Sequence, residues 1–202
     1  GNFLGAIQPA LDLSNSYDCY YFVADYHALT TVKDASRLRE DVLRIAATWL
    51  ACGLDPKTHM FYRQSDIPEL CELAWILSCH TPKGLLNRSH AYKSIVDMNV
   101  KDGLDADKSI NIGLFSYPVL MAADILAFDC TIVPVGIDQK QHVEIARDIA
   151  LSFNHTYGNV FKIPEPIITE SVHTIPGVDG RKMSKNYNNI IIIMYCCIFI
   201  LL

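Results

Sequence analysis

The stretch from Ile132 to Gln139, IVPVGIDQ, decides the fold, because a β-branched strand there passes through a glycine into the start of a helix. Gly136 lets the backbone approach a ligand, and Asp138 stands where a carboxylate can accept both hydroxyls of a ribose. Asp138 and Gln141, three residues later, also form a helix-capping pattern. Spacing alone favours the cap over the nucleotide site.

Strands and helices alternate along the rest of the chain, which predicts an α/β fold with a mostly parallel sheet covered on both faces. Ligands of such sheets bind at the carboxyl ends of the strands. Thr81 is the expected N-cap of one helix, with Pro82 at its first position. The predicted strands cover 17–24, 60–62 and 130–135, and the predicted helices cover 36–51, 68–79, 82–97, 117–127 and 138–153.

The composition of the 202 residues suits one domain with a substantial core, since half of them are apolar. A net charge of -5 argues against a chain that grips a nucleic-acid backbone over its whole surface. The seven cysteines form no C-x-x-C pair and mostly lie in apolar runs. They predict reduced core residues and a reducing, cytoplasmic compartment.

The two ends of the chain are unusual. No signal peptide is evident and residue 1 is glycine, so we expect the natural start to lie upstream. Ile190 to Leu202, IIIIMYCCIFILL, is an uncharged run too short to span a bilayer, which takes roughly 20 residues. We interpret this apolar tail as the product of a truncation or a reading-frame error.

A short basic loop, Arg181–Asn186, RKMSKN, places two lysines around a serine. Two fixed ammonium groups can follow charge as it moves from the inner phosphate of a nucleotide to a departing pyrophosphate. Basic loops on solvated surfaces are common, so the loop by itself is weak evidence.

Asp124 lies in a predicted helix that is apolar on nearly every side. Its carboxylate must find a hydrogen-bond donor, because an unpaired buried carboxylate is costly. Tyr117, Met121 and Asp124 share one helix face. An apolar slot with one acceptor suits a flat aromatic ligand with a single N–H, such as indole. A buried aspartate that caps a neighbouring loop is an equally good interpretation.

Among the other polar candidates, His27 follows a predicted strand and could contact a ligand, although a structural role is commoner. His142 and Glu144 lie two positions apart on a helix and point to different faces, which argues against a metal pair, and no ligand cluster supports zinc. Arg88 and Lys93 could reach a phosphate, but a solvated helix face is the default.

Together these pieces resemble the tryptophanyl-tRNA synthetases, which are class I aminoacyl-tRNA synthetases, over residues 1–189. Gly1–Ile7, GNFLGAI, looks like the end of the family's first signature, a histidine-containing strand-to-helix turn that closes with Gly-Asn. Residues 134–144 match a second family stretch. Lys182–Lys185 match the KMSKS loop, with Asn186 in place of its final serine.

The resemblance implies a Rossmann-like nucleotide-binding fold, the catalytic domain of a class I synthetase, truncated at both ends. Residues 1–189 would form this domain without its first strand and with a helical insertion at about 68–112. The apolar tail, 190–202, would stand where the anticodon-binding domain is expected.

The resemblance also assigns roles to individual residues. Asp124 would accept the indole N–H, Tyr117 and Gln139 would hold the α-amino group of tryptophan, and Met121 would line the ring pocket, with His27 in the same site. The implied catalytic residues are those that would contact the phosphates of ATP: Lys93, Lys182, Ser184 and Lys185. The implied ATP-binding residues are Gly1, Asn2, Gly136, Ile137, Asp138, Ile175, Lys182, Met183, Ser184, Lys185 and Asn186.

The implied reaction joins L-tryptophan to ATP by attack of the carboxylate on the α-phosphorus, with Mg²⁺ bridging phosphates and no protein metal site. The nucleophile is already ionised at neutral pH, so no general base is required. The activated tryptophan would pass to its cognate tRNA. The resemblance also implies a homodimer, with its interface near the helices of residues 68–97, and no membrane association.

Three alternatives remain open at this point. Tyrosyl-tRNA synthetases share the fold and both signatures, although Met121 and Asp124 suit indole better than a phenol. A second alternative is a non-catalytic remnant that binds tryptophan or nucleotide. The third is a fragment that does not fold stably.

Overall fold

The strands form two parallel pairs in the computed structural model, which describes residues 7–168, apart from the side chain of Asp138. β1 (Tyr20–Val23) pairs with β2 (Met60–Arg63), and β3 (Ile132–Val135) pairs with β4 (Glu165–Ile168). The parallel direction of the strands agrees with the sequence prediction. The predicted single sheet is not observed, because the strands within residues 7–168 form two separate sheets. Residues of β1 and β3 line one cavity.

The crossover from β1 to β2 runs through α2 (Asp25–Ala28) and α3 (Ala35–Ala51). α3 confirms the predicted helix 36–51 to within one residue. Asp34 caps it by accepting hydrogen bonds from the backbone N–H groups of Ser36 and Arg37, at 2.8 and 3.1 Å. Trp49 is buried against Tyr21 of β1, with ring centroids 5.2 Å apart. These contacts fix the helix against the first strand pair.

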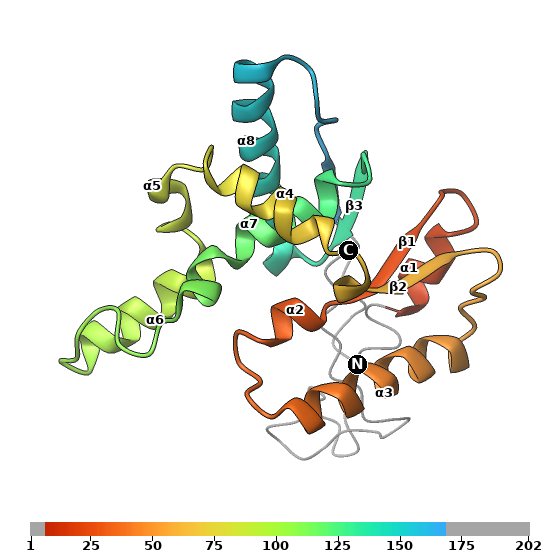
Figure 1. Cartoon of the computed structure of the whole chain (residues 1–202), viewed down its shortest axis with the longest axis horizontal. Helices are drawn as coiled ribbons and strands as arrows, with labels where there is room; N and C mark the ends of the chain where they lie inside the picture. The colour runs from red at the N-terminus through yellow and green to blue at the C-terminus, as the bar shows by residue number, and fades with distance from the viewer. Residues whose placement is uncertain (1–6, 169–202) are drawn as a thin grey trace.

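The N-terminal helix α1 (Gln8–Leu13) packs against the same strand pair (Figure 1). The hydroxyl of Tyr21 donates a hydrogen bond of 2.7 Å to the backbone oxygen of Ala10. Ile7 and Ala10 are buried in one cluster with Tyr21 and Trp49. This small core therefore joins α1, β1 and α3.

Between β2 and β3 the chain forms a helical segment: η2 (Gln64–Asp66), α4 (Glu69–Ser78), α5 (Lys83–Leu86), α6 (His90–Lys101) and α7 (Ile112–Leu126). Figure 1 shows α6 reaching away from the strands. α4 agrees with the predicted helix 68–79, and α7 begins five residues before the predicted start at Tyr117.

The predicted single helix over 82–97 is wrong. The chain forms α5, breaks, and starts α6 after Ser89, whose ψ is 136°. Thr81 is not the N-cap, because its hydroxyl donates to the backbone oxygen of Leu77, and Pro82 takes the cap position with a ψ of 132°. Gln141, from the later helix of residues 140–157, holds the break through hydrogen bonds with the backbone of Arg88 and His90.

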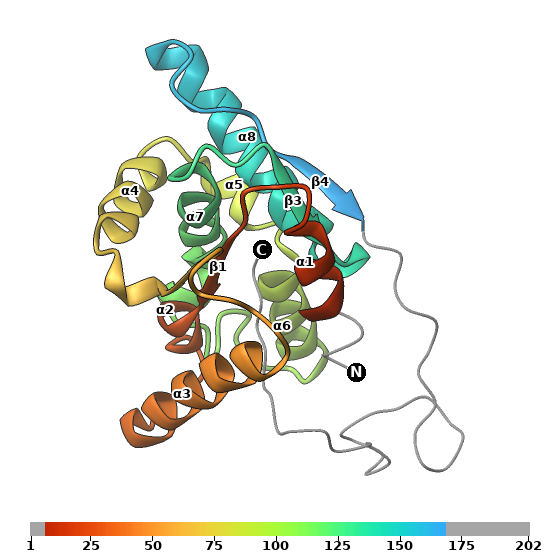
Figure 2. The same cartoon turned by 90° about the vertical axis from the view of Figure 1, so that its right-hand side faces the viewer.

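The larger core surrounds α7. Figure 2 shows α7 between α4 and α8 (Lys140–Tyr157), which follows the short η3 (Ile137–Gln139). Leu77 of α4, Val119 and Met121 of α7 and Val143 of α8 are fully or almost fully buried in one cluster. Close packing of this kind leaves α7 little freedom to move. α7 is therefore a rigid base for the side chains that it directs toward the strands.

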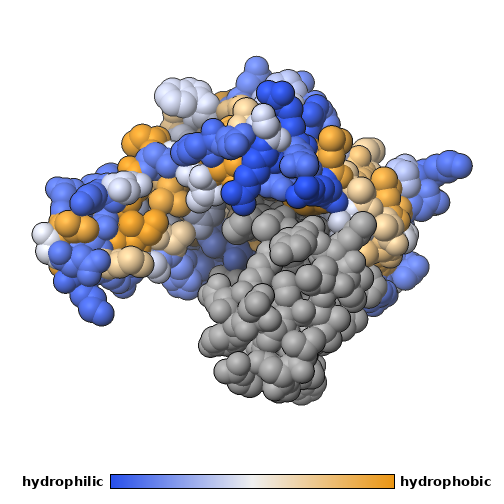
Figure 3. All heavy atoms as spheres, turned by 90° about the horizontal axis from the view of Figure 1, so that it is seen from below, coloured by the Kyte–Doolittle hydropathy of each residue, from blue (hydrophilic) through white to orange (hydrophobic). Residues whose placement is uncertain are grey.

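The surface carries apolar side chains among the polar ones, and Figure 3 shows a group of them at the α6 end of the molecule. Met98, Val100 and Ile112 are exposed there. The five described cysteines are free, but Cys71 and Cys79 are exposed, so the prediction of core cysteines is wrong for these two. Within residues 7–168 we find no helix with the length and apolar character to cross a membrane.

Candidate active site

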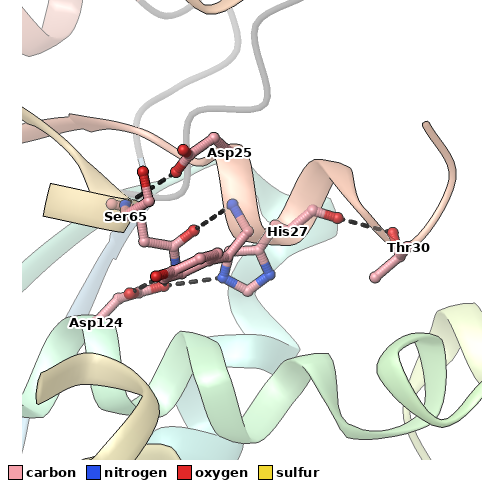
Figure 4. A network of polar contacts seen from close by, with 7 residues as sticks. Asp25, His27, Thr30, Ser65 and Asp124 are labelled. Atoms are coloured by element: carbon pink, nitrogen blue, oxygen red, sulfur yellow. Dashed lines mark hydrogen bonds and ion pairs between the residues drawn. The ribbon is translucent and has the colours of Figure 1, made fainter. Parts of the chain in front are cut away.

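The carboxyl ends of β1 and β2 lie side by side because the two strands are parallel. His27 follows β1 on α2, Gln64 follows β2 at the start of η2, and Asp124 reaches them from α7. Nε2 of His27 lies 2.8 Å from Oδ2 of Asp124 (Figure 4). Nε2 of Gln64 lies 2.8 Å from Oδ1 and 2.9 Å from Oδ2 of the same carboxylate.

A second layer of hydrogen bonds fixes the loop ends that carry these side chains. Oε1 of Gln64 accepts a hydrogen bond of 3.1 Å from the backbone N–H of Tyr26. Asp25 accepts one of 3.0 Å from the backbone N–H of Ser65, and Figure 4 shows these two residues facing each other. The ends of β1 and β2 are thus tied to each other as well as to Asp124.

The charge of Asp124 depends on two opposing influences. Burial raises the pKa of its carboxyl above the usual value, whereas the hydrogen bonds and charge of His27 and the hydrogen bond of Gln64 lower it. Tyr62 of β2 lies close enough that its pKa is raised, mainly by burial and then by the charge of Asp124. The expectation that this carboxylate finds a donor is confirmed, but its donors are the side chains of His27 and Gln64, and the loop-capping interpretation is wrong.

A cavity of about 410 Å³ opens beside this network. Met121 and Asp124 line it together, as their shared helix face predicts. The remaining wall is mainly apolar and aromatic, and includes Phe22, Tyr62 and Val133. Such a volume falls in the range of roughly 300–1,000 Å³ that is typical of small-molecule sites. An apolar cavity with a buried carboxylate at its wall is therefore present.

Tyr117 takes a different position from the other two residues of its predicted face. Its hydroxyl hydrogen-bonds to Nε2 of His142, and its ring meets the ring of His27 edge to face, with centroids 6.1 Å apart. It does not belong to the lining of the cavity. Tyr117 thus stands next to the Asp124 network, on the side of α8.

The turn after β3 connects the strand to α8 as predicted, with Gly136 between β3 and η3. The φ of Gly136 is -67°, a value that any residue can adopt, so the backbone conformation of this turn does not require glycine. Ile137 is 70% exposed and Gln139 is half-buried. The side chain of Asp138 lies outside the described part of the chain.

The sequence predicts a helix cap formed by Asp138 and Gln141. The prediction is wrong for Gln141, whose side chain bonds to another segment. Oε1 of Gln141 accepts a hydrogen bond of 2.9 Å from the backbone N–H of His90, and Nε2 donates one of 3.0 Å to the backbone oxygen of Arg88. Gln141 therefore holds the junction of α5 and α6 against α8.

Lys93 is exposed on α6, and no hydrogen bond or ion pair between described residues joins its side chain to the other predicted site residues. Glu144 pairs with Lys140, whereas His142 turns to Tyr117, which confirms that the two point to different faces. The following predicted residues lie outside residues 7–168: Gly1, Asn2, Ile175, Lys182, Met183, Ser184, Lys185 and Asn186.

Gln64 and its contact with Asp124 are not among the residues predicted from the sequence. A signal was available, because Gln64 directly follows a strand, and side chains at the carboxyl ends of parallel strands form ligand sites. The pairing itself crosses 60 positions of sequence and had no local signature.

The sequence profile of the class I tRNA synthetases for tryptophan and tyrosine (W and Y) matches residues 1–195. The chain belongs to this family. The fold class expected from the resemblance, a class I synthetase catalytic domain with parallel strands, is thereby confirmed.

Individual members of the family are closely similar to the chain. It is 58% identical over 194 residues to a tryptophan–tRNA ligase of Bordetella pertussis and 59% identical over 196 residues to one of Pseudomonas putida. In each case the match covers 95% of this chain but only 43% and 44% of the relative. The chain thus spans less than half the length of these curated relatives.

Solved structures of the family share the fold. A tryptophanyl-tRNA synthetase of Campylobacter jejuni, crystallised with ADP and tryptophan, has a TM-score of 0.83 at 49% identity, and the match covers 94% of this chain and 57% of that one. A tyrosyl-tRNA synthetase of Archaeoglobus fulgidus has a TM-score of 0.68 at 21% identity, over 92% of this chain and 54% of its own, and shows the fold alone.

Proposed function

We propose that this chain provides the tryptophan-binding and ATP-binding part of a tryptophan–tRNA ligase, which activates L-tryptophan with ATP and transfers it to the cognate tRNA. The observation that carries the proposal is the buried Asp124 carboxylate in the wall of an apolar cavity, beside Met121. The ligand bound by the Campylobacter jejuni relative and the names of the curated relatives support tryptophan as the amino acid.

In this proposal the cavity takes the indole ring, and Asp124 accepts a hydrogen bond from the indole N–H. Met121 and the aromatic wall bury the ring, which is the main source of affinity for an apolar group. Tyr117 and Gln139 hold the α-amino group, so that the carboxylate of tryptophan points to the turn after β3. His27 acts through its contact with Asp124.

ATP binds across the same turn. Gly136 to Asp138 bind the ribose, and Ile175 packs near adenine. Gly1, Asn2 and Lys93 contact the phosphates. Lys182, Ser184 and Lys185, with Met183 and Asn186 in the same loop, follow the negative charge as pyrophosphate departs. Positioning and charge stabilisation supply the catalysis, since the nucleophile carries its charge already.

Mg²⁺ would neutralise phosphate charge and is held by ATP itself in this proposal. Within the described residues no cluster of three or more His, Cys, Asp or Glu side chains is placed to hold a metal ion.

Two further features extend the proposal to the whole protein. Trp75 and Ile76 of α4 are 73% and 46% exposed, which supports a homodimer interface on this helix. Leu86 is buried and belongs to the core, whereas Leu73 and Leu85 pack at its margin. The free cysteines support the reducing, cytoplasmic compartment proposed from the sequence.

The test is thermal unfolding of the chain with and without tryptophan, since a ligand of the native state raises the midpoint. At a hundredfold excess over Kd the gain is about 2.7 kcal/mol, or a rise of roughly 5–10 °C for a chain of this size. The rise should be strongly reduced in Asp124→Asn, which leaves only one neutral acceptor oxygen, and persist in the matched control Asp97→Asn, which changes an exposed aspartate on α6. Equal rises with tyrosine would refute the choice of amino acid.

Catalysis is tested separately by ATP–pyrophosphate exchange. Exchange that requires tryptophan supports the ligase, and binding of tryptophan without exchange would make the chain a binding remnant.

A further inference from the structure

The side chain of Gln64 connects three elements of the site. It is fully buried, with an exposed fraction of 0%. Its Nε2 donates to both carboxylate oxygens of Asp124 on α7, at 2.8 and 2.9 Å, while its Oε1 accepts from the backbone N–H of Tyr26 on α2, at 3.1 Å. Both ends of the amide are therefore engaged, and its donor end is aimed at the carboxylate.

The amide N–H groups of Gln64 affect the charge state of Asp124, because they donate to its carboxylate. Hydrogen bonds donated to a carboxylate stabilise its charged form, which burial otherwise disfavours. An ionised carboxylate is only an acceptor, whereas a protonated carboxyl also donates. Indole N–H is only a donor. The match is best while Asp124 is ionised and keeps its orientation, because both of its oxygens then only accept.

We propose that Gln64 is a positioning residue that holds the Asp124 carboxylate ionised and oriented, and thereby makes the cavity select an amino acid whose ring carries an N–H donor. This inference rests on the proposed tryptophan site and assigns the source of its selectivity. Gln64 itself acts through Asp124 and needs no contact with the ligand.

The other groups around Asp124 do not substitute for Gln64. His27 of α2 bonds to Oδ2 only, and Tyr62 of β2 is the other titratable side chain whose charge interacts with it. On its own helix, Tyr117 turns to His142 of α8. The acidic side chains of α4, Glu69 and Glu72, are exposed. Removal of Gln64 therefore leaves Oδ1 without a donor among the described residues.

The experiment compares Gln64→Met with the unchanged chain, because methionine keeps the length and volume of glutamine but donates no hydrogen bond. Two ligands are titrated by calorimetry across a pH series: tryptophan and β-(3-benzothienyl)alanine, which has sulfur in place of the indole N–H. We expect tryptophan to bind on the order of tenfold more weakly to the variant at neutral pH, with benzothienylalanine changed less than about twofold. The pH midpoint above which tryptophan binds tightly should rise in the variant, because the charged form of Asp124 loses a donated hydrogen bond.

Gln141→Met is the matched control, since Gln141 also bridges two segments through its amide but contacts neither Asp124 nor the cavity. It should leave the ratio of the two ligands and the pH midpoint unchanged. An equal loss of both ligands in Gln64→Met, with an unmoved midpoint, would show a packing role only and overturn the inference. Failure of the unchanged chain to bind tryptophan at all would overturn the proposed function, and the inference with it.

A second measurement does not depend on the folding of the variant. The side-chain amide protons of Gln64 are followed by ¹⁵N–¹H NMR in the unchanged chain. We expect a downfield amide proton that moves with the same pH midpoint as tryptophan binding. A resonance that stays constant through that midpoint would contradict the inference.

Discussion

Nε2 of His27 lies 2.8 Å from Oδ2 of Asp124, although 97 positions of sequence separate the two residues. Both side chains are buried. The contact docks α2, at the end of the first strand pair, on α7, which belongs to the larger core. This one pair therefore joins the two halves of the described fold at the wall of the cavity.

Replacement of Asp124 by alanine should destabilise the chain more than replacement by asparagine. Alanine leaves the buried donors of His27 and Gln64 without an acceptor, at a cost of about 3–5 kcal/mol, whereas asparagine keeps one acceptor oxygen and should cost about 1–2 kcal/mol. Urea unfolding measures both, with Asp97→Asn as the control. Equal losses for the two variants would mean that the donors find other partners.

The pH dependence of stability should carry the signature of Asp124. Because its pKa is raised in the folded chain, the unfolded chain releases its proton first as pH increases. The free energy of unfolding should therefore fall from about pH 4 up to the raised pKa and then level off. Tryptophan binding should rise over the same interval, since the ionised carboxylate is the acceptor. The difference between the unchanged chain and Asp124→Asn isolates this contribution, and a difference that is constant with pH would contradict it.

The lysines of the basic loop should affect the rate of tryptophan activation and not the affinity for tryptophan. Lys182→Ala and Lys185→Ala should each lower tryptophan-dependent ATP–pyrophosphate exchange by about 100-fold, with tryptophan affinity within about twofold. Lys57→Ala, at an exposed turn, is the control. Unaltered exchange in both loop variants would remove the loop from the mechanism.

Gln141 should hold the junction between α5 and α6. Gln141→Ala removes the acceptor of the His90 N–H and the donor to the Arg88 oxygen, which should cost about 1–2 kcal/mol. Hydrogen exchange followed by mass spectrometry should show faster exchange in peptides that contain His90, with α3 as the internal reference. Unchanged protection at this junction would show that packing alone maintains the break.

Trp75 should contribute to a homodimer through α4. Trp75→Ser removes an exposed aromatic side chain and should weaken the dimer by about 30-fold or more, as judged by sedimentation at several concentrations. Leu43→Ser, on an equally exposed position of α3, should leave the association unchanged. A dimer that tolerates both changes would have its interface elsewhere.

Much of the fold follows from local patterns. The apolar spacing of 36–51 predicts α3 almost to its ends, because helix periodicity and the stop at Gly53 are properties of neighbouring residues, and Gly53 has a φ of +106°. The strand–glycine–helix pattern around Gly136 is present for the same reason. Helix spacing also predicts that Met121 and Asp124 share one face, and the structure brings both to one cavity wall.

Other features depend on contacts between distant segments. The helix predicted over 82–97 is broken where Gln141, more than 50 positions away, takes the backbone groups of Arg88 and His90. The partners of Asp124 are likewise decided by the parallel pairing of β1 and β2, which brings His27 and Gln64 to the same edge. Local periodicity reflects backbone geometry within a few residues, whereas a buried carboxylate must be satisfied by whichever donors the assembled elements bring within about 3 Å.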